Sequence, residues 1–375
     1  MKNKLPILVG GTLITYWGVF LALQFCHQDQ DFSELENRYL ASKPSFSTST
    51  LLDGTFGEDF ETYIADQFPL RNSFIALKSE SERILQKKEN NGVFLGKDGY
   101  LLQDFETPDM DRAETNANYI NSLAENFNVY IALAPTATKV LEDKLPDYAS
   151  PYDEGQYISD FYAALSDNVH KVPILETLQA QLDSGEQLYY KTDHHWTTLG
   201  AYYAYTSFCE TAGILPTPLS DFDIETVSDD FYGTLFSKGN FTFIEPDSLQ
   251  IFYPRVENQL SVNYEGSGTT TDSLYEYSHL EVKDKYSVFL DNNHPLIQIK
   301  TSVDNDRKLL VIKDSYANCF IPFLTAHYGE IYVLDLRYAN MPIQTFANEN
   351  HIDDIMLLYN VQNFSAEGKL SLLLK

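Results

Sequence analysis

One short stretch decides the fold of this chain: Leu309-Leu310-Val311-Ile312-Lys313-Asp314-Ser315, four apolar residues that run into a polar turn. Such a run is typical of a strand buried on both faces of a parallel sheet. Similar runs at residues 331–334 and 355–359 follow at a spacing of about twenty-two residues, which leaves room for a crossover helix each time. An earlier run, residues 129–134, closes at Pro135. The sequence therefore predicts an α/β fold with a mostly parallel sheet.

The composition narrows the class of protein. A length of 375 residues allows one large domain or two small ones, and 43% hydrophobic residues exclude an intrinsically disordered chain. Lys and Arg number 26 against 54 Asp and Glu, and the formal charge of −28 argues against a nucleic-acid partner. The cysteines Cys26, Cys209 and Cys319 are too scattered for a disulfide scaffold or for a zinc site with paired cysteine spacing.

The amino terminus predicts a membrane anchor. Residues 5–26 form a run of 22 without a charged side chain, long enough to cross a hydrocarbon layer. Lys2 and Lys4 precede this run and Asp29 and Asp31 follow it, so the positive-inside bias places the rest of the chain outside the cytoplasm. A cleaved signal peptide is the alternative. We favour the uncleaved anchor because the run is longer than a usual signal core and no small-residue cleavage site follows it.

The expected organisation follows from these features. A polar stretch rich in serine follows the anchor, and a Tyr-, Phe-, Asp- and Ser-rich stretch separates the early strand from the late ones. We expect a cytoplasmic stub at 1–4, the transmembrane anchor at 5–26, a membrane-proximal linker at 27–55, and a catalytic domain at 56–375 with an irregular or β-rich insertion at about 215–306.

The densest cluster of reactive side chains lies in residues 189–200, just before a predicted helix that Thr197 or Thr198 can cap. In an extended segment, residues two apart point the same way, so Asp193 and His195 can share one face. A carboxylate on imidazole Nδ1 leaves Nε2 free as a base and stabilises the imidazolium formed afterwards. The alternative is a purely structural hydrogen bond.

A candidate nucleophile for that base is Ser315. It follows a predicted parallel strand and precedes a predicted helix, where backbone N–H groups and the helix dipole favour a developing oxyanion. Asp and Ser at such turns are often only helix caps. The serine and the Asp193–His195 pair together favour acyl transfer more strongly than either does alone.

These residues carry a family resemblance. Asp193-His194-His195-Trp196 resembles the signature of the bacterial DHHW family, and ordered matches continue at residues 32–38, 66–71, 96–101 and 313–317. The family resembles the SGNH-hydrolase-like domain of alginate O-acetyltransferase-type proteins, with its Asp-x-His element placed before the serine. The resemblance implies a circularly permuted three-layer α/β/α sandwich. It also implies Asp193 as orienter, His195 as base and Ser315 as nucleophile.

Some site residues have weaker support. No Gly-x-Asn-Asp segment supplies a side-chain oxyanion donor, so we expect the backbone N–H of Ser315 or Tyr316 in that role, with Thr136 as a weaker candidate. Trp196 and Asn318 are the expected substrate contacts. A metal site from Asp193, His194 and His195 with the distant His279, His294 or His327 is disfavoured, because adjacent histidines diverge. We expect no cofactor.

The resemblance implies an extracytoplasmic, serine-dependent O-acetyltransferase of the bacterial cell membrane that acts on a cell-surface or secreted polysaccharide through an acetyl-serine intermediate. A membrane-bound O-acyltransferase would then supply the acetyl group. Two alternatives stay open: a carbohydrate O-acetylesterase with the same triad, and a non-catalytic glycan-binding or scaffold subunit.

Overall fold

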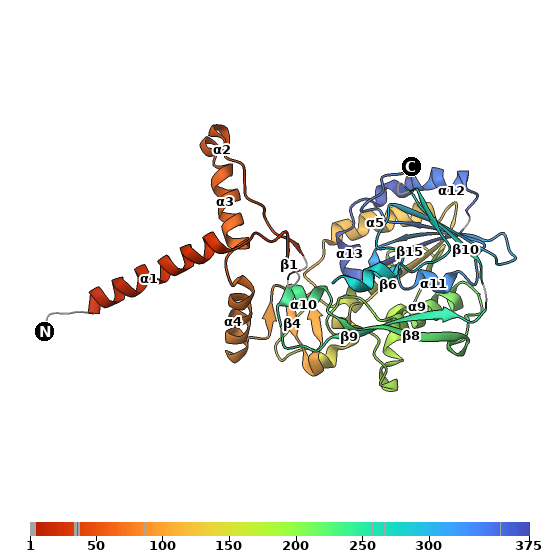
Figure 1. Ribbon diagram of the computed structural model, residues 1–375. Coiled ribbons are helices and arrows are strands. Elements are labelled where there is room, and N and C mark those ends of the chain that lie inside the picture. Colours follow the sequence, from red (N-terminus) through yellow and green to blue (C-terminus); the bar gives the residue numbers. More distant parts are fainter. Residues whose placement is uncertain are drawn as a thin grey trace. The chain divides into compact units, whose positions relative to one another are not determined.

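The computed structural model describes residues 5–33, 36, 38–85, 87–256, 258–265, 268–352 and 354–375 (Figure 1). The chain forms two compact units, one from residues 1–87 with 240–242 and one from residues 88–239 with 243–375. The predicted stub at 1–4 lies outside the described residues, as do positions 34, 35 and 37 of the matched segment 32–38.

The first unit is helical apart from one short strand pair. Its elements are α1 Leu5–Cys26, β1 Phe32–Ser33, β2 Arg38–Tyr39, α2 Thr48–Leu52, α3 Thr55–Asp66 and α4 Arg71–Ile84. Two ion pairs tie β2 and the turn before it to α3 and α4: Arg38 with Asp66 at 2.5 Å, and Glu36 of the turn with Arg71 at 2.5 Å. The hydrogen bonds from Arg38 outweigh burial and lower the pKa of Asp66 to about 2, so this pair is ionised at neutral pH.

The prediction that residues 5–26 cross a membrane is wrong. Helix α1 covers this segment, but within the described part of the chain no helix is both long enough and apolar enough to span a bilayer. The segment lacks charge, yet Gly10, Gly11, Thr12 and Gln24 dilute its apolar surface, and a charge-free run is therefore a weaker criterion than a continuously apolar one. The predicted single-pass location in a bacterial cell membrane is corrected for the same reason.

The second unit is built around an eight-stranded mixed sheet of order β11-β10-β12-β14-β13-β15-β6-β7. Its strands are β6 Asn128–Ala134, β7 Val169–Lys171, β10 Leu260–Tyr264, β11 Thr269–Thr271, β12 Leu296–Thr301, β13 Lys308–Lys313, β14 Glu330–Leu334 and β15 Asp354–Asn360. The run from β14 to β7 is parallel, as the apolar runs predict. The β10, β11 and β12 pairings are antiparallel, and these strands come from the insertion and its end, where the sequence shows no comparable apolar runs.

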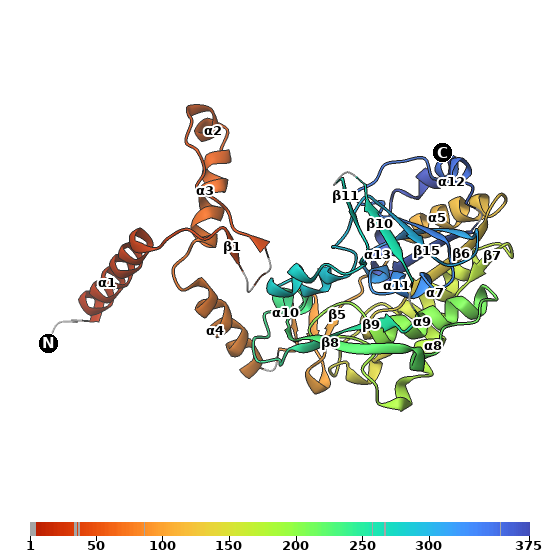
Figure 2. The same cartoon turned by 45° about the vertical axis from the view of Figure 1, so that its right-hand side comes forward.

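Strict alternation along the central strands produces two cores. In β13, for example, Leu309 and Val311 face one core, while Leu310 and Ile312 face the other. Helices α5 Met110–Leu123, α7 Glu154–Ala163, α12 Ile343–Glu349 and α13 Val361–Ala366 cover one face. The opposite face carries α8 Ile174–Gln179, α9 Thr198–Thr211 and α11 Ile321–Leu324, with the hairpin of β8 Phe222–Phe231 and β9 Asp247–Pro254 (Figure 2). The result is a three-layer arrangement.

Smaller elements complete the second unit around the carboxyl end of the parallel strands. They are the three-stranded sheet of β3 Glu89–Asn90, β4 Val93–Leu95 and β5 Leu101–Gln103, together with α6 Ala137–Val140 and α10 Thr234–Gly239. Helix α10 contacts each of these three strands. Since β13 ends at Lys313, the serine of the candidate site stands where the central parallel strands finish.

Candidate active site

Ser315 lies in the turn that follows β13, and the side chain of Asp314 shapes this turn. The Asp314 carboxylate accepts hydrogen bonds from the N–H of Tyr316 at 3.0 Å, from the N–H of Asn360 at 3.0 Å and from Nδ2 of Asn363 at 2.7 Å. These contacts join the turn to the end of β15 and to α13. The Asp of the Asp-Ser pair is thus a cap and anchor of the turn.

The segment that holds Asp193 and His195 is fixed in a similar way. Asp247 accepts hydrogen bonds from the N–H of Lys191 at 2.9 Å, and from the N–H and hydroxyl of Thr192 at 2.8 and 2.7 Å. Thr197 caps α9 by accepting from the N–H of Gly200, one of the two capping residues expected. The loop is thereby held at both ends, which restricts the directions that its side chains can take.

Two reciprocal hydrogen bonds connect this segment to the serine turn. Trp196 Nε1 donates to the carbonyl oxygen of Tyr316 at 3.0 Å, and the Tyr316 hydroxyl donates to the carbonyl oxygen of His194. Trp196 is fully buried. It therefore supports the turn in this structure, and a contact with substrate stays a prediction.

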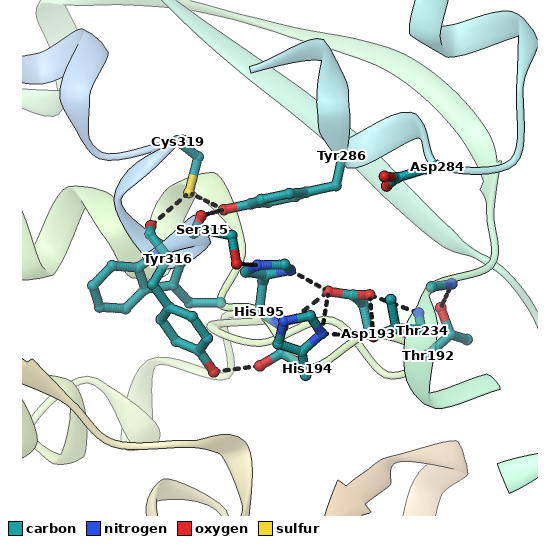
Figure 3. A network of polar contacts seen from close by, with 12 residues as sticks. Thr192, Asp193, His194, His195, Thr234, Asp284, Tyr286, Ser315, Tyr316 and Cys319 are labelled. Atoms are coloured by element: carbon teal, nitrogen blue, oxygen red, sulfur yellow. Dashed lines mark hydrogen bonds and ion pairs between the residues drawn. The ribbon is translucent and has the colours of Figure 1, made fainter. Parts of the chain in front are cut away.

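Asp193, His195 and Ser315 come together in a continuous line (Figure 3). His195 Nδ1 lies 2.5 Å from Asp193 Oδ1, and His195 Nε2 lies 2.8 Å from Ser315 Oγ. The simplest assignment of protons has Nδ1–H donating to the carboxylate and the serine hydroxyl donating to Nε2. This arrangement has the geometry of a nucleophile, a base and an orienting carboxylate.

The second oxygen of Asp193 is held by a residue from beyond β8. Oδ2 accepts hydrogen bonds from the N–H of Thr234 at 2.7 Å and from its hydroxyl at 3.0 Å. Burial favours the neutral acid, but the imidazoles of His194 and His195 and the hydrogen bonds from His195 and Thr234 hold the pKa of Asp193 well below its ordinary value. Asp193 is therefore a carboxylate at neutral pH.

Two rings enclose the imidazole of His195. The ring of Tyr286 stacks on it at a centroid distance of 3.8 Å with an interplanar angle of 12°, and the ring of His194 lies 3.8 Å away at 39°. Figure 3 shows Tyr286 above His195 and His194 below it. His194 Nδ1 donates to the hydroxyl of Thr234 at 2.6 Å, since that hydroxyl is itself donated to Asp193. Burial lowers the pKa of His194 to about 4, which leaves this ring neutral at physiological pH.

The predicted oxyanion donors differ in whether their N–H or hydroxyl group is already hydrogen-bonded to another residue. The N–H of Tyr316 is already donated to Asp314, which leaves the N–H of Ser315 as the backbone donor that we propose. The Thr136 hydroxyl donates to Glu154 at 2.5 Å, and its oxygen accepts from the N–H of Thr138 at 3.2 Å, capping α6. Within the described residues, no hydrogen bond joins Thr136 to Asp193, His195 or Ser315.

Asn318 belongs to a buried polar network beside the serine turn. Its Oδ1 accepts a hydrogen bond from Nζ of Lys313 at 2.8 Å, and Lys313 also donates to Oδ1 of Asn293 at 2.7 Å. Lys313 pairs with Asp335 at 3.4 Å, and Arg337 pairs with the same carboxylate at 2.6 Å. Burial lowers the pKa of Lys313 to about 8. In this structure Asn318 braces the turn, and its predicted contact with substrate stays untested.

One group of potential metal ligands shares Asp193 and His195 with the triad. One ligand atom each from Asp193, His194 and His195 lies within 4.8 Å of the others. The Nδ1 atoms of both histidines and both oxygens of Asp193 already take part in hydrogen bonds, so a metal ion would have to displace them. The distant histidines pair elsewhere: His279 and His294 with Asp291, and His327 with Tyr205.

Sequence reasoning missed three contributors to the site. Tyr286 stacks on the base, Thr234 holds Asp193, and Gly233 allows the close approach of its chain segment to Asp193. All of them lie in the stretch expected as an irregular insertion, and no spacing relates them to Asp193 or Ser315. The Gly233-Thr234 pair at the start of α10 is a sequence feature that also occurs at ordinary helix starts, and it gives no signal for Tyr286.

Comparison with known proteins places the chain in context. A family model described as DHHW protein matches residues 120–334, more than half of the chain. Among curated proteins, one named probable alginate O-acetylase AlgJ from Pseudomonas syringae pv. tomato is 27% identical over 175 residues, which are 43% of this chain and 44% of the relative. Its namesake from Pseudomonas fluorescens is 25% identical over 211 residues, 53% of this chain and 52% of the relative. The chain thus spans about half the length of the curated relatives it matches.

Solved structures resemble more of the chain. A DHHW family protein from Eubacterium siraeum has a TM-score of 0.63 and 26% identity, and the match covers 76% of this chain and 95% of that one. Bacillus cereus PatB1 has a TM-score of 0.63 and 23% identity, with 73% and 96% of the two chains covered. At that identity the likeness to PatB1 shows a shared fold alone.

Proposed function

The chain belongs to the DHHW family, and on that premise we propose that it is a serine-dependent O-acetyltransferase that acts on a polysaccharide through an acetyl-serine intermediate. The observation that carries the proposal is the line of contacts Asp193–His195–Ser315, with 2.5 Å from carboxylate to Nδ1 and 2.8 Å from Nε2 to the serine oxygen. The curated relatives named alginate O-acetylases support acetyl transfer as the reaction class.

The first half-reaction loads the serine. Nε2 of His195 takes the proton of the Ser315 hydroxyl as Oγ bonds to the carbonyl carbon of an acetyl ester. Asp193 stabilises the imidazolium that results, and the N–H of Ser315 donates to the oxyanion. The bond to the donor oxygen then breaks, and that oxygen takes the proton back from His195.

The second half-reaction repeats these steps with a new alcohol. A hydroxyl of the acceptor gives its proton to Nε2 and attacks the acetyl carbon, and Ser315 leaves with the proton that His195 returns. Water in the place of the acceptor would give the esterase reaction, so the two activities differ only in the acceptor. The acetyl supplier implied by the resemblance, a membrane-bound O-acyltransferase, stays a prediction.

The charge of the chain bears on the acceptor. With 54 acidic against 26 basic residues, the protein repels a polyanion at low ionic strength. We therefore infer an uncharged polysaccharide as the acceptor, although the curated relatives are named for alginate, a polyuronate.

The test is direct detection of the intermediate. Incubation with 4-nitrophenyl acetate, followed by mass spectrometry of the Ser315 peptide, is expected to reveal an acetyl adduct in the wild type and none in Ser315→Ala. Ser237→Ala is the matched control, because Ser237 is also buried and its hydroxyl has no partner among the described residues. Absence of any adduct and of any ester turnover in the wild type would favour the scaffold alternative. Given an adduct, transfer to neutral oligosaccharides separates transferase from esterase.

A further inference from the structure

The segment 284–293 of the insertion reaches the reaction centre at both of its ends. Near its start, the Tyr286 ring lies on His195, and at its end Asn293 accepts hydrogen bonds from Lys313 at 2.7 Å and from Arg337 at 3.1 Å. Lys313 is the residue two before Ser315. A part of the expected insertion therefore contacts the base directly and contacts the residues beside the nucleophile.

This segment has an unusual backbone. Leu290, Asp291 and Asn292 have φ values of 58°, 50° and 73°, three consecutive residues in the left-handed region, and none of them is glycine. Such conformations are costly for residues with a Cβ, and they tend to occur at functional sites where the surroundings enforce them. Here the side chain of Asp291, the middle residue of the three, is held by His279 at 2.7 Å and by His294 at 3.4 Å.

Tyr286 makes more than one contact in the centre. Its ring is nearly parallel to the imidazole of His195, at 3.8 Å and 12°, and its hydroxyl donates to the carbonyl oxygen of Ser315 at 3.2 Å. The same hydroxyl lies 3.2 Å from the sulfur of Cys319. Tyr286 is almost fully buried, and burial holds its pKa well above the ordinary value, so the ring faces the imidazole as a neutral phenol.

The geometry points to Tyr286 as a positioning residue: its ring face fixes the orientation of His195 and stabilises the imidazolium formed when His195 takes the proton of Ser315. A cation over the face of an aromatic ring is attracted by the ring quadrupole, and exclusion of water strengthens that attraction. The ring and the hydroxyl are separable, because the ring contacts the base while the hydroxyl contacts the backbone of the nucleophile. This inference rests on the proposed acyl-transfer function.

Other groups face the imidazole and must stay constant in a test. Asp193 and His194 come from its own segment, and Ser315 and Tyr316 come from the serine turn. Asp284 also lies on segment 284–293. Burial raises the pKa of Asp284, with a further contribution from the charge of Asp193. Substitutions at Tyr286 leave all five in place.

The experiment compares Tyr286→Phe, Tyr286→Leu and the control Tyr205→Leu. Tyr205 is a buried tyrosine stacked on His327 at 5.6 Å and 23°, and among the described residues its hydroxyl hydrogen-bonds with His327 and Thr217 rather than with the triad. The first readout is the rate at which phenylmethylsulfonyl fluoride labels Ser315 over a pH series, with kcat and KM for 4-nitrophenyl acetate. The second is the Hε1 resonance of His195 in a proton NMR titration, which needs no activity. Melting temperature is recorded for each variant.

We expect Tyr286→Phe to label within about threefold of the wild type, because the ring face is kept. Tyr286→Leu is expected to label and turn over roughly 10- to 100-fold more slowly, with KM changed less than about twofold, since general-base catalysis depends on the orientation of the base. The midpoint of its acid limb and of the Hε1 titration should move about half a pH unit lower. Tyr205→Leu should lose stability without these changes.

The other possible results would overturn either the role of Tyr286 or the proposed function. Unchanged labelling and an unchanged titration in Tyr286→Leu, or changes that Tyr205→Leu reproduces, overturn the inference. A loss in Tyr286→Phe equal to that in Tyr286→Leu overturns the assignment to the ring. If wild-type Ser315 is neither labelled nor acetylated, the proposed function fails, and the Hε1 titration alone then upholds or overturns the positioning role of Tyr286.

Discussion

Gly233 approaches Asp193 so closely that a β-carbon on Gly233 would lie 2.2 Å from the β-carbon of Asp193 and 2.4 Å from its Oδ2. No side chain fits at that distance, so position 233 must be glycine as long as Asp193 keeps its place. The next residue, Thr234, supplies both hydrogen bonds to Oδ2. The close approach at Gly233 therefore brings Thr234 to the place where it hydrogen-bonds the Asp193 carboxylate.

Gly233→Ala should displace Asp193 from His195 and lower the rate of Ser315 acetylation by roughly 100-fold or more, since misplacement by about 1 Å has that effect on catalysis. Mass spectrometry of the Ser315 peptide over time gives the rate. Gly368→Ala is the control for a glycine substitution as such, because Gly368 is an exposed loop residue with nothing within 4 Å and without a left-handed backbone conformation. A Gly233→Ala variant with wild-type acetylation would contradict the assigned contact.

Asp193→Asn should leave the fold in place and lower kcat by about 10³- to 10⁴-fold, because the amide offers Nδ1 the wrong partner and no charge to balance the imidazolium. KM for 4-nitrophenyl acetate should change little. Steady-state kinetics measures both, and circular dichroism verifies the fold. A loss of less than tenfold would argue that Asp193 is only a structural partner of His195.

The buried carboxyl of Glu154 should make the stability of the wild type depend on pH in a way that Glu154→Gln does not. Burial raises its pKa to about 7 from an ordinary value of 4.5, so the folded state holds the proton more tightly than the unfolded state. The stabilisation present below pH 4.5 is lost as pH rises towards 7. Relative to wild type, Glu154→Gln should thus gain up to about 3 kcal/mol in free energy of unfolding between these pH values. Urea unfolding at several pH values measures the difference, and a difference constant with pH would contradict the raised pKa.

The acceptor inference predicts a salt effect. At low ionic strength, acetyl transfer to a neutral oligosaccharide should be at least tenfold faster than transfer to an oligouronate, and added salt should narrow the gap because it screens the charge of −28. Acetylated products are quantified by mass spectrometry from the same acetyl donor. Faster acetyl transfer to the oligouronate than to the neutral oligosaccharide at low salt would contradict the inference of a neutral acceptor.

The sequence predicted the parts of the fold that have a local signature. The apolar runs became β13, β14, β15 and β6, because strands buried on both faces need continuous apolar residues. It also singled out Asp193, His195 and Ser315, which the structure brings into contact across 120 positions of sequence. Their catalytic roles stay predictions until the intermediate is sought.

Other features had no such signature. The absence of charge in residues 5–26 predicts a membrane span, but glycine and polar residues dilute the apolar character of the segment, and no described helix can span a bilayer. Strand β12 pairs antiparallel with β14, β10 pairs with β12 and β11 pairs with β10, so each of these strands depends on pairing partners that its own sequence does not specify. Tyr286 and Thr234 act through spatial proximity alone, and a single sequence contains no distance between residues so far apart.

The two hydrogen bonds made by Trp196 and Tyr316 affect which parts of this fold can change without loss of the catalytic geometry. Trp196 donates to the carbonyl oxygen of Tyr316, and Tyr316 donates to that of His194. The distance between the histidine segment and the serine turn is therefore set by these bonds and not by the length of the polypeptide that joins them. Exposed loops of the joining polypeptide can therefore change in length without moving His195 relative to Ser315, as long as these two hydrogen bonds are kept. New acceptor preferences could then arise by remodelling the connecting chain alone.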